Sequence, residues 1–305
     1  MKRVVSVSLG SSRRDHAVES EILGTRFRIE RIGTNGDLEK AIEIVRSLDG
    51  KVDAFGMGGI DLYIVAGKKR YILNDARRIA EAARITPIVD GSGLKNTLER
   101  RSIKYLQEKG IIDFRDKSTL LVCGVDRFGM AEALEESGAN VTFGDLIFGL
   151  NVPVPIRSLR TLAGVARVLG PLVSRLPFKY LYPTGDKQDV ITTRFCKYYE
   201  ENEIIAGDFH YIKRYMPEDL RNKIIITNTV IKEDIETLGK RGAQILITTT
   251  PEFQGRSFGT NVMEAVLVTL LDKPVKEITE EDYHTILDQV GFLPRIIYLP
   301  KVLTA

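Results

Sequence analysis

The sequence predicts two α/β domains, of which the second contains a doubly wound, mostly parallel sheet. Strand and helix patterns alternate over residues 1–93 and again over residues 111–275. A polar, charged helical segment, residues 94–110, separates the two regions. A chain of 305 residues is long enough for two domains of ordinary size. We therefore expect a domain over 1–93, a connecting helix over 94–110, a second domain over 111–275, and a C-terminal helix and tail over 276–305.

The first region alternates β-branched and apolar runs with amphipathic helices. Asp37 is expected to cap a helix whose apolar positions recur at helical spacing, and a second helix follows Asn74 or Asp75. Gly67-Lys68-Lys69 is typical of a hairpin turn between two short strands. The strands are predicted at Val4–Leu9, Phe27–Ile32, Val52–Met57, Leu62–Val65, Arg70–Leu73 and Thr86–Val89.

The second region continues the alternation after residue 118. Its strands are predicted at Leu120–Val125, Asn140–Phe143, Ile204–Gly207, Lys223–Thr227 and Gln244–Thr248. Its helices are predicted at Met130–Ser137, Leu159–Leu176, Lys232–Arg241 and Val262–Leu271, with a last helix from Thr279 to Gly291. Asn261 and Glu264 have the spacing of a capping box ahead of the apolar helix. The basic, proline-containing segment 153–190 has no assigned role.

Composition limits the classes of function. The net charge of +3 gives no case for nucleic acid or a membrane as a partner, and no apolar run has the length of a transmembrane helix. Cys123 and Cys196 form neither a disulfide framework nor a zinc spacing, so no metal is predicted. We expect a cytoplasmic protein that binds a small molecule, and a homo-oligomer stays open.

The segment Ser118–Asp145 has the order of a dinucleotide-binding unit, namely strand, glycine turn, helix, strand and acid. The turn is Gly124-Val-Asp126-Arg-Phe-Gly129, so an aspartate replaces the middle glycine. A carboxylate about 4 Å from a pyrophosphate charge costs roughly 4 kcal/mol at an effective dielectric of about 20. Asp145 suits a ribose diol, and no basic residue follows it to receive a 2′-phosphate. The candidate cofactor is NAD rather than NADP, bound by Gly124, Asp126, Gly129 and Asp145 in a Rossmann-like domain.

Candidate catalytic residues follow strands in both regions. Asp90 precedes the connecting helix, where its carboxylate would face the cleft between domains. Lys69, or its neighbour Lys68, could form an acid–base pair with an aspartate, although a hairpin lysine is also ordinary surface chemistry. His210 follows a strand of the second region and is the best placed of three histidines.

Candidate substrate-binding residues are the serines of the first strand and one aspartate of the second region. Ser6 and Ser8 could bind a polyol or a carboxylate, and Arg13 and Arg14 follow them closely. Asp208 lies two residues before the candidate histidine. The same residues are also common in turns and in loop hydrogen bonds.

The order of these parts resembles the shikimate/quinate dehydrogenase family. Ser6-Val-Ser8 matches that family's early serine pair, Asp90–Gly93 matches its Asp-x-x-Gly motif, and a helix from Leu94 leads into the dinucleotide region. The resemblance implies an NAD(P)-linked oxidoreductase acting on a small hydroxylated anion of the quinate or shikimate kind. It also implies catalysis by Asp90 with a lysine, for which Lys69 is chosen by location.

Two other functions use the same cleft. One is a non-redox module that binds a nucleotide or metabolite, and the other is a transferase with an adenosine donor. Asp126 favours these two, because a ligand without a pyrophosphate tolerates the carboxylate better. If Asp90 is the catalytic acid or base, Asp90→Asn is expected to abolish turnover with little loss of stability.

Overall fold

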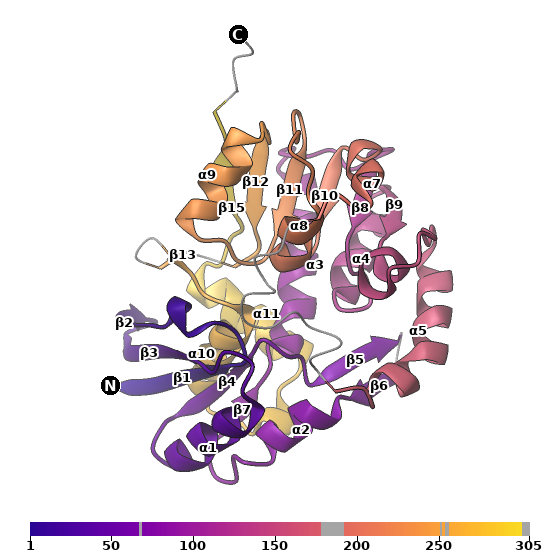
Figure 1. The fold of residues 1–305 in the computed structure, drawn as a ribbon. Helices are drawn as coiled ribbons and strands as arrows, with labels where there is room; N and C mark the ends of the chain where they lie inside the picture. Colours follow the sequence, from indigo (N-terminus) through magenta and orange to yellow (C-terminus); the bar gives the residue numbers. More distant parts are fainter. Residues whose placement is uncertain (67–68, 178–191, 251, 254–255, 301–305) are drawn as a thin grey trace.

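The structure is a computed structural model that describes residues 1–66, 69–177, 192–250, 252–253 and 256–300. It contains two main sheets, one in each half of the molecule, with helices on both faces of each (Figure 1). The two-domain α/β fold predicted from the sequence is therefore confirmed. In the described part of the chain, no helix has both the length and the apolar character needed to span a membrane.

The first sheet has the strand order β2-β3-β1-β4-β7, and only β2 runs antiparallel to its neighbour. Its strands are β1 (Lys2–Ser8), β2 (His16–Ile22), β3 (Thr25–Gly33), β4 (Ala54–Gly58) and β7 (Ile88–Val89). Consecutive residues of β1 are buried, because Val4 packs on one face of the sheet and Val5 on the other. Burial of adjacent residues on opposite faces is typical of parallel strands that are covered on both sides.

Different parts of the chain supply the helices on the two faces of this sheet. The face that contains Val5 is covered by α1 (Leu38–Leu48) and α2 (Asn74–Ala80). The opposite face is covered by α10 (Thr260–Leu271) and α11 (Glu280–Val290), which lie far along the chain. Asp37 caps α1 as predicted, since its Oδ1 accepts a hydrogen bond of 2.9 Å from the amide of Lys40.

The position of α10 differs from the predicted division of the chain. The sequence pattern assigned residues up to 275 to the second domain, but α10 packs on β1, β4 and the helix α3 (Ser92–Glu108). Val262 and Val266 belong to the same core as Val4. Because α10 is apolar around much of its circumference, its pattern does not indicate which sheet it covers.

The second sheet has the order β15-β12-β11-β10-β8-β9, with only β15 antiparallel. Its strands are β8 (Ser118–Leu121), β9 (Asn140–Phe143), β10 (Ile204–Ala206), β11 (Ile224–Thr227), β12 (Ile245–Thr248) and β15 (Arg295–Tyr298). Its helices are α4 (Phe128–Glu136), α5 (Leu159–Val173), α7 (Cys196–Glu200), α8 (Phe209–Tyr215) and α9 (Lys232–Lys240). The core around α4 lies on one face and the core around α8 on the other. The chain runs from β8 to β9 on one side and then crosses to β10 on the other side of β8, so the strand order reverses between β8 and β10. Sheets of this kind bind ligands at such a point.

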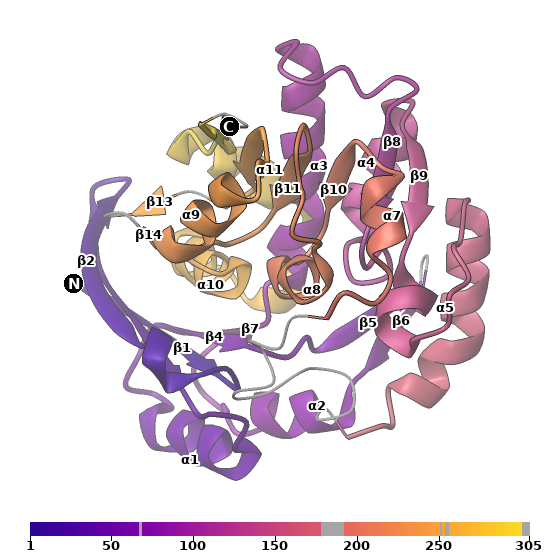
Figure 2. The ribbon, with the colours of Figure 1, turned by 45° about the horizontal axis from the view of Figure 1, so that its top comes forward.

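Two elements join the halves of the molecule. The helix α3 contributes Leu94 and Leu98 to the first core and Ile103 and Leu106 to the second. The hairpin of β5 (Tyr63–Ala66) and β6 (Lys69–Ile72) extends from the first half and contacts α5 of the second (Figure 2). A Cβ on Gly170 would lie 2.8 Å from the ring of Tyr71, so this glycine permits the contact. The short pair β13 (Glu252–Phe253) and β14 (Arg256–Ser257) completes the strands.

Candidate functional site

A cavity of about 810 Å³ lies between the two domains. The ends of strands from both sheets, the start of α3 and the inner face of α5 line it. Seven of the predicted site residues are among those that line it, namely Ser6, Ser8, Asp90, Asp126, Asp145, Asp208 and His210. Gly124 and Gly129 are not lining residues. Lys68 lies outside the described residues, and Lys69 is described only as the first residue of β6, without its side chain.

A lysine that the sequence analysis missed lies at the centre of this site. Lys95, in the first turn of α3, places its Nζ 3.1 Å from Oδ1 of Asp61 and 2.9 Å from Oδ1 of Asp126. Its side chain is only 10% exposed. Burial would lower the pKa of Lys95, but Asp126 and Asp61 raise it, so the lysine stays charged. One ammonium group is thus shared by a carboxylate of the first domain and one of the second.

The two carboxylates around Lys95 have opposite pKa shifts. Burial and the neighbouring Asp126 raise the pKa of Asp61 to about 8. Burial acts on Asp126 in the same direction, but Lys95 and Arg127 outweigh it and hold the pKa of Asp126 below its ordinary value. When two carboxyl groups lie close together, the pKa of one is commonly raised and that of the other lowered, because the two charged forms repel each other. The site therefore holds a protonated acid beside a carboxylate near neutral pH.

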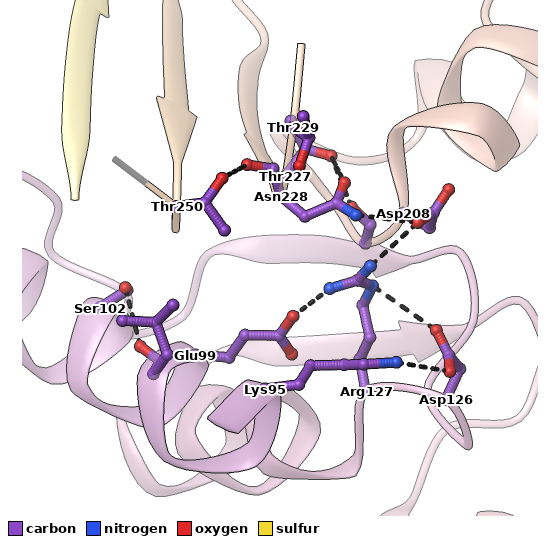
Figure 3. Close-up of polar contacts among 12 residues, drawn as sticks. Lys95, Glu99, Ser102, Asp126, Arg127, Asp208, Thr227, Asn228, Thr229 and Thr250 are labelled. Atoms are coloured by element: carbon purple, nitrogen blue, oxygen red, sulfur yellow. Dashed lines mark hydrogen bonds and ion pairs between the residues drawn. The ribbon is translucent and has the colours of Figure 1, made fainter. Parts of the chain in front are cut away.

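Arg127 connects the glycine turn to the rest of the site (Figure 3). Its guanidinium group, 2% exposed, pairs with Glu99 of α3 and lies 3.0 Å from Oδ2 of Asp208. Asp208 also receives a hydrogen bond of 3.0 Å from Nδ2 of Asn228 and caps α8 through the amide of His210, at 2.8 Å. Asp208 was predicted to bind substrate, but these bonds make it an anchor for Arg127 and for α8.

Asp90 and Glu264 both hold the start of α3. Oδ1 of Asp90 accepts hydrogen bonds from the amide and hydroxyl of Ser92, at 3.0 and 2.6 Å, and Oδ2 accepts one of 2.6 Å from the amide of Leu62. Glu264 of α10 receives the amides of Gly91 and Leu94, at 2.6 and 3.2 Å. Glu264 thus anchors α3 rather than forming the predicted capping box, and Gly259 is the N-cap of α10.

Asp90→Asn should lower the free energy of unfolding by about 1 to 3 kcal/mol, because a carboxamide places an N–H₂ donor where the carboxylate accepts one of its three hydrogen bonds. This expectation differs from the one drawn from the sequence, which predicted little loss of stability. Urea unfolding of the wild type and the variant measures the difference. Ser92→Ala, which removes one of the three bonds, is the matched control and should lose less. An Asp90→Asn variant as stable as the wild type would contradict the anchoring role.

The glycine turn is occupied by an acid of the chain itself. The amides of Gly124 and Val125 donate to Asp145, at 3.0 and 2.9 Å. Burial raises the pKa of Asp145 to about 6, although these amides act in the opposite direction. Asp145 was expected to face a ribose, whereas in the structure both of its carboxylate oxygens accept amides of the turn that precedes α4.

The two glycines of the turn permit close packing instead of phosphate approach. A Cβ on Gly124 would lie 2.8 Å from side-chain carbons of both Leu162 and Phe143. A Cβ on Gly129 would overlap Asn96 of α3. Gly124 therefore allows α5 to cover the turn, and Gly129 allows α4 to pack against α3. A dinucleotide turn assigns a different contact to its last glycine, namely close packing of the helix against a strand.

A second group of cavity residues is basic. Arg31 donates from Nη2 to Oγ of Ser8, at 3.0 Å, and from Nη1 to Oδ1 of Asp15, at 2.7 Å. Nη1 of Arg14 lies 3.1 Å from Nε2 of His210, so this pair joins the two domains. Burial lowers the pKa of His210, with a smaller contribution of the same sign from Arg14. The predicted Ser6 and Ser8 lie in this part of the cavity, and the hydroxyl of Ser6 accepts a hydrogen bond of 2.8 Å from Asn261.

Two signals in the sequence could have identified the missed residues. Lys95 and Glu99 are four residues apart on the helix that begins directly after Asp90. Asp61 follows β4 through Gly58-Gly59, and strand ends of this kind meet at the ligand-binding edge of a sheet. Among the residues that the structure describes, no group of three or more His, Cys, Asp and Glu side chains could hold a metal ion.

Several solved structures are similar to this chain over most of its length. NAD-dependent malic enzyme from Thermotoga maritima is 13% identical with a TM-score of 0.34, over 95% of this chain and 84% of that one. GanP, a glucose-galactose binding protein from Geobacillus stearothermophilus, is 10% identical with a TM-score of 0.38, over 97% of each chain. The bifunctional enzyme FolD (methylenetetrahydrofolate dehydrogenase/cyclohydrolase) from Campylobacter jejuni is 12% identical with a TM-score of 0.30, over 95% and 87%. At these TM-scores the likeness carries no argument about ligand or activity.

No curated protein matches this chain, but two family models together cover nearly all of it. Residues 3–90 match the family described as Domain of unknown function (DUF8753), and residues 93–299 match Domain of unknown function (DUF8754). The two matches meet at the start of α3, where Asp90 and Glu264 hold the chain. Since its match spans more than half of the sequence, the chain belongs to the DUF8754 family.

Proposed function

We propose that the cleft between the domains binds a small hydroxylated anion and that Asp61, Lys95 and Asp126 exchange a proton with its hydroxyl group. The observation that carries this proposal is the Lys95 ammonium group shared by the carboxyl groups of Asp61 and Asp126, in the same cavity as Arg14 and Arg31. The cavity volume of about 810 Å³ is in the range of small-molecule sites.

The basic side of the cavity supports an anionic ligand. Burial lowers the pKa of Arg31, and the positive charge of Arg14 lowers it further. A carboxylate or phosphate between them would relieve this repulsion and accept paired hydrogen bonds from guanidinium groups. Ser8 adds a hydroxyl that is already oriented by Arg31. Ligand binding here would also contact His210, which belongs to the second domain.

The acidic side supports proton transfer to or from a hydroxyl. A carboxyl group with a pKa of about 8, such as Asp61, is poised to donate or accept a proton near neutral pH. Lys95 stabilises the carboxylate form when the proton leaves. This is the lysine–aspartate pair that the sequence analysis looked for, formed by Lys95 and Asp61 in place of Lys69 and Asp90.

The site supports the non-redox alternative better than the two others. A dehydrogenase would need a dinucleotide at the glycine turn, and a nucleotide ligand in any of the three functions would place a ribose at Asp145, whereas a metabolite without a ribose would not. That carboxylate instead accepts the amides of Gly124 and Val125. The resemblance to shikimate/quinate dehydrogenases therefore stays a prediction. It makes quinate and shikimate the first ligands to test.

Arg14→Gln should weaken binding of a hydroxylated carboxylate by about 10- to 100-fold, the loss expected for one charge-assisted hydrogen bond. Calorimetry with quinate, shikimate and their methyl esters measures it, and the esters should bind the wild type weakly. Arg115→Gln removes an exposed arginine and is the matched control. If the esters bind as well as the acids, or if Arg14→Gln leaves the affinity unchanged, the anion site is not at Arg14.

A further inference from the structure

The glycine turn after β8 has the chain order of a phosphate-binding turn but different partners. In such a turn the backbone amides at the start of the helix point to the phosphate oxygens. Here the amides of Gly124 and Val125 point to the two oxygens of Asp145, at 3.0 and 2.9 Å. The amide of Arg127 donates to the carbonyl of Gly124, at 3.2 Å, within the turn itself. The chain itself therefore satisfies the amides of Gly124, Val125 and Arg127, all of which lie in the turn ahead of Phe128, the first residue of α4.

We infer that Asp145 is a built-in anion that closes this turn, so that the protein takes no pyrophosphate there. The carboxylate provides the charge and the acceptors that a bound phosphate would provide, and it comes from the end of the neighbouring strand β9. A second anion at the amides of Gly124 and Val125 would find both already bonded and would be repelled by Asp145. This inference does not depend on the proposed ligand, because it concerns only the turn.

The structure distinguishes Asp145 from Asp126, the residue that departs from the glycine pattern. The carboxylate of Asp126 is 2.9 Å from Lys95 and 3.8 Å from Nε of Arg127, and no hydrogen bond joins it to the amides of Gly124 or Val125 in the described structure. The sequence pattern identifies Asp126 as the obstacle to phosphate, whereas the geometry assigns that role to Asp145. The two residues therefore give opposite expectations for substitution.

The test compares Asp145→Ala with Asp126→Gly, using inorganic pyrophosphate as the probe. Calorimetry at pH 8, above the pKa of about 6 for Asp145, keeps the wild-type carboxylate ionised. Asp145→Ala should bind pyrophosphate about tenfold or more tightly than the wild type, since it frees two amide donors and removes one like charge. Asp126→Gly should bind no better than the wild type. Asp145→Asn, which keeps the size of the side chain, should give a smaller gain.

Each outcome decides the inference. A gain in Asp145→Ala with none in Asp126→Gly supports it. Equal or weaker pyrophosphate binding in Asp145→Ala overturns it, as does a gain in Asp126→Gly alone. If circular dichroism shows that Asp145→Ala does not fold, Asp145→Asn takes its place, and an Asn variant without any gain also overturns the inference. Protection of the Gly124 and Val125 amides from hydrogen exchange, lost for both in Asp145→Ala and for one of them in Asp145→Asn, provides a readout independent of binding.

Discussion

Arg127→Met should lower the free energy of unfolding by about 3 to 5 kcal/mol, the range found when one partner of a buried ion pair is removed. The guanidinium group is 2% exposed and its partner Glu99 is 1% exposed, so the carboxylate would remain buried without its cation (Figure 3). Asp208 would lose the same partner. Urea unfolding followed by circular dichroism measures the loss, since the chain has no tryptophan.

A double variant separates the buried charge from the lost packing. Glu99→Gln combined with Arg127→Met removes both charges of the pair, and we expect it to be more stable than Arg127→Met alone. Asp113→Asn breaks the exposed pair with Arg115 and should leave the melting temperature nearly unchanged. Additive losses in the double variant would show that Glu99 and Arg127 do not stabilise each other.

The same ion pairs explain why the site is held together by α3. Lys95 and Glu99 lie one turn apart on the same side of this helix. Lys95 pairs with Asp61 of the first domain, and Glu99 pairs with Arg127 of the second. Burying charges is unfavourable unless each is paired, so the two domains are held in the one arrangement that pairs them. The cleft is in this way defined by electrostatics as well as by the apolar cores at its two sides.

Local pattern was sufficient to predict most of the fold. Val4 and Val5 are adjacent apolar residues, and Ile224–Ile226 are apolar at successive positions, because both faces of each sheet are covered; such runs are read directly as strands. The strand β2 was not predicted. It lies at the edge of the first sheet, and its alternate residues are exposed to solvent. The pairing of α10 with the first sheet was missed because it depends on contacts between residues about 200 positions apart in the chain.

The site was predicted in location but not in detail. Residues such as Ser6, Asp126 and His210 line the cavity because the carboxyl ends of parallel strands converge at one edge of each sheet. Their partners could not be deduced in the same way. Asp145 accepts a hydrogen bond from the amide of Gly124, and Glu264 accepts one from the amide of Gly91, 173 positions away. No local sequence pattern indicates either bond. Residue type and strand position thus identify a candidate, whereas its role depends on which donors the fold places beside it.

The stability of the protein should fall as pH rises from about 5 to about 8. Burial raises the pKa of Asp61 to about 8, of Glu264 to about 7 and of Asp145 to about 6, all above the ordinary carboxyl range. In this window each group is protonated in the folded chain and ionised in the unfolded chain, so unfolding releases a proton. The free energy of unfolding then decreases by about 1.4 kcal/mol per pH unit for each such group, until pH reaches the pKa of its folded form.

The interval from pH 7 to pH 8 depends mainly on Asp61. Asp145 is already ionised there in the folded chain, whereas Glu264, with a pKa of about 7, completes its ionisation within this interval. His210, whose pKa is lowered by burial, has the opposite sign but acts only near and below the ordinary histidine pKa of about 6.5. Asp126, whose pKa is lowered, would lose its contribution only in the acid range. The wild type should therefore lose roughly 1.4 kcal/mol between pH 7 and pH 8, of which about 1 kcal/mol comes through Asp61 and the rest through Glu264.

Asp61→Asn should remove most of this loss, and over pH 5 to pH 8 it should remove about 4 kcal/mol of the decrease, because the amide does not ionise. Glu264→Gln is the matched control, since it should flatten the profile mainly below pH 7 and remove only the smaller part of the loss between pH 7 and pH 8. Urea unfolding at each pH measures all three profiles. A wild-type stability that is constant or rises from pH 7 to pH 8 would mean that Asp61 is ionised in the folded chain. The acid proposed to face the substrate hydroxyl would then have no proton to donate, although Asp61 could still accept one beside Lys95.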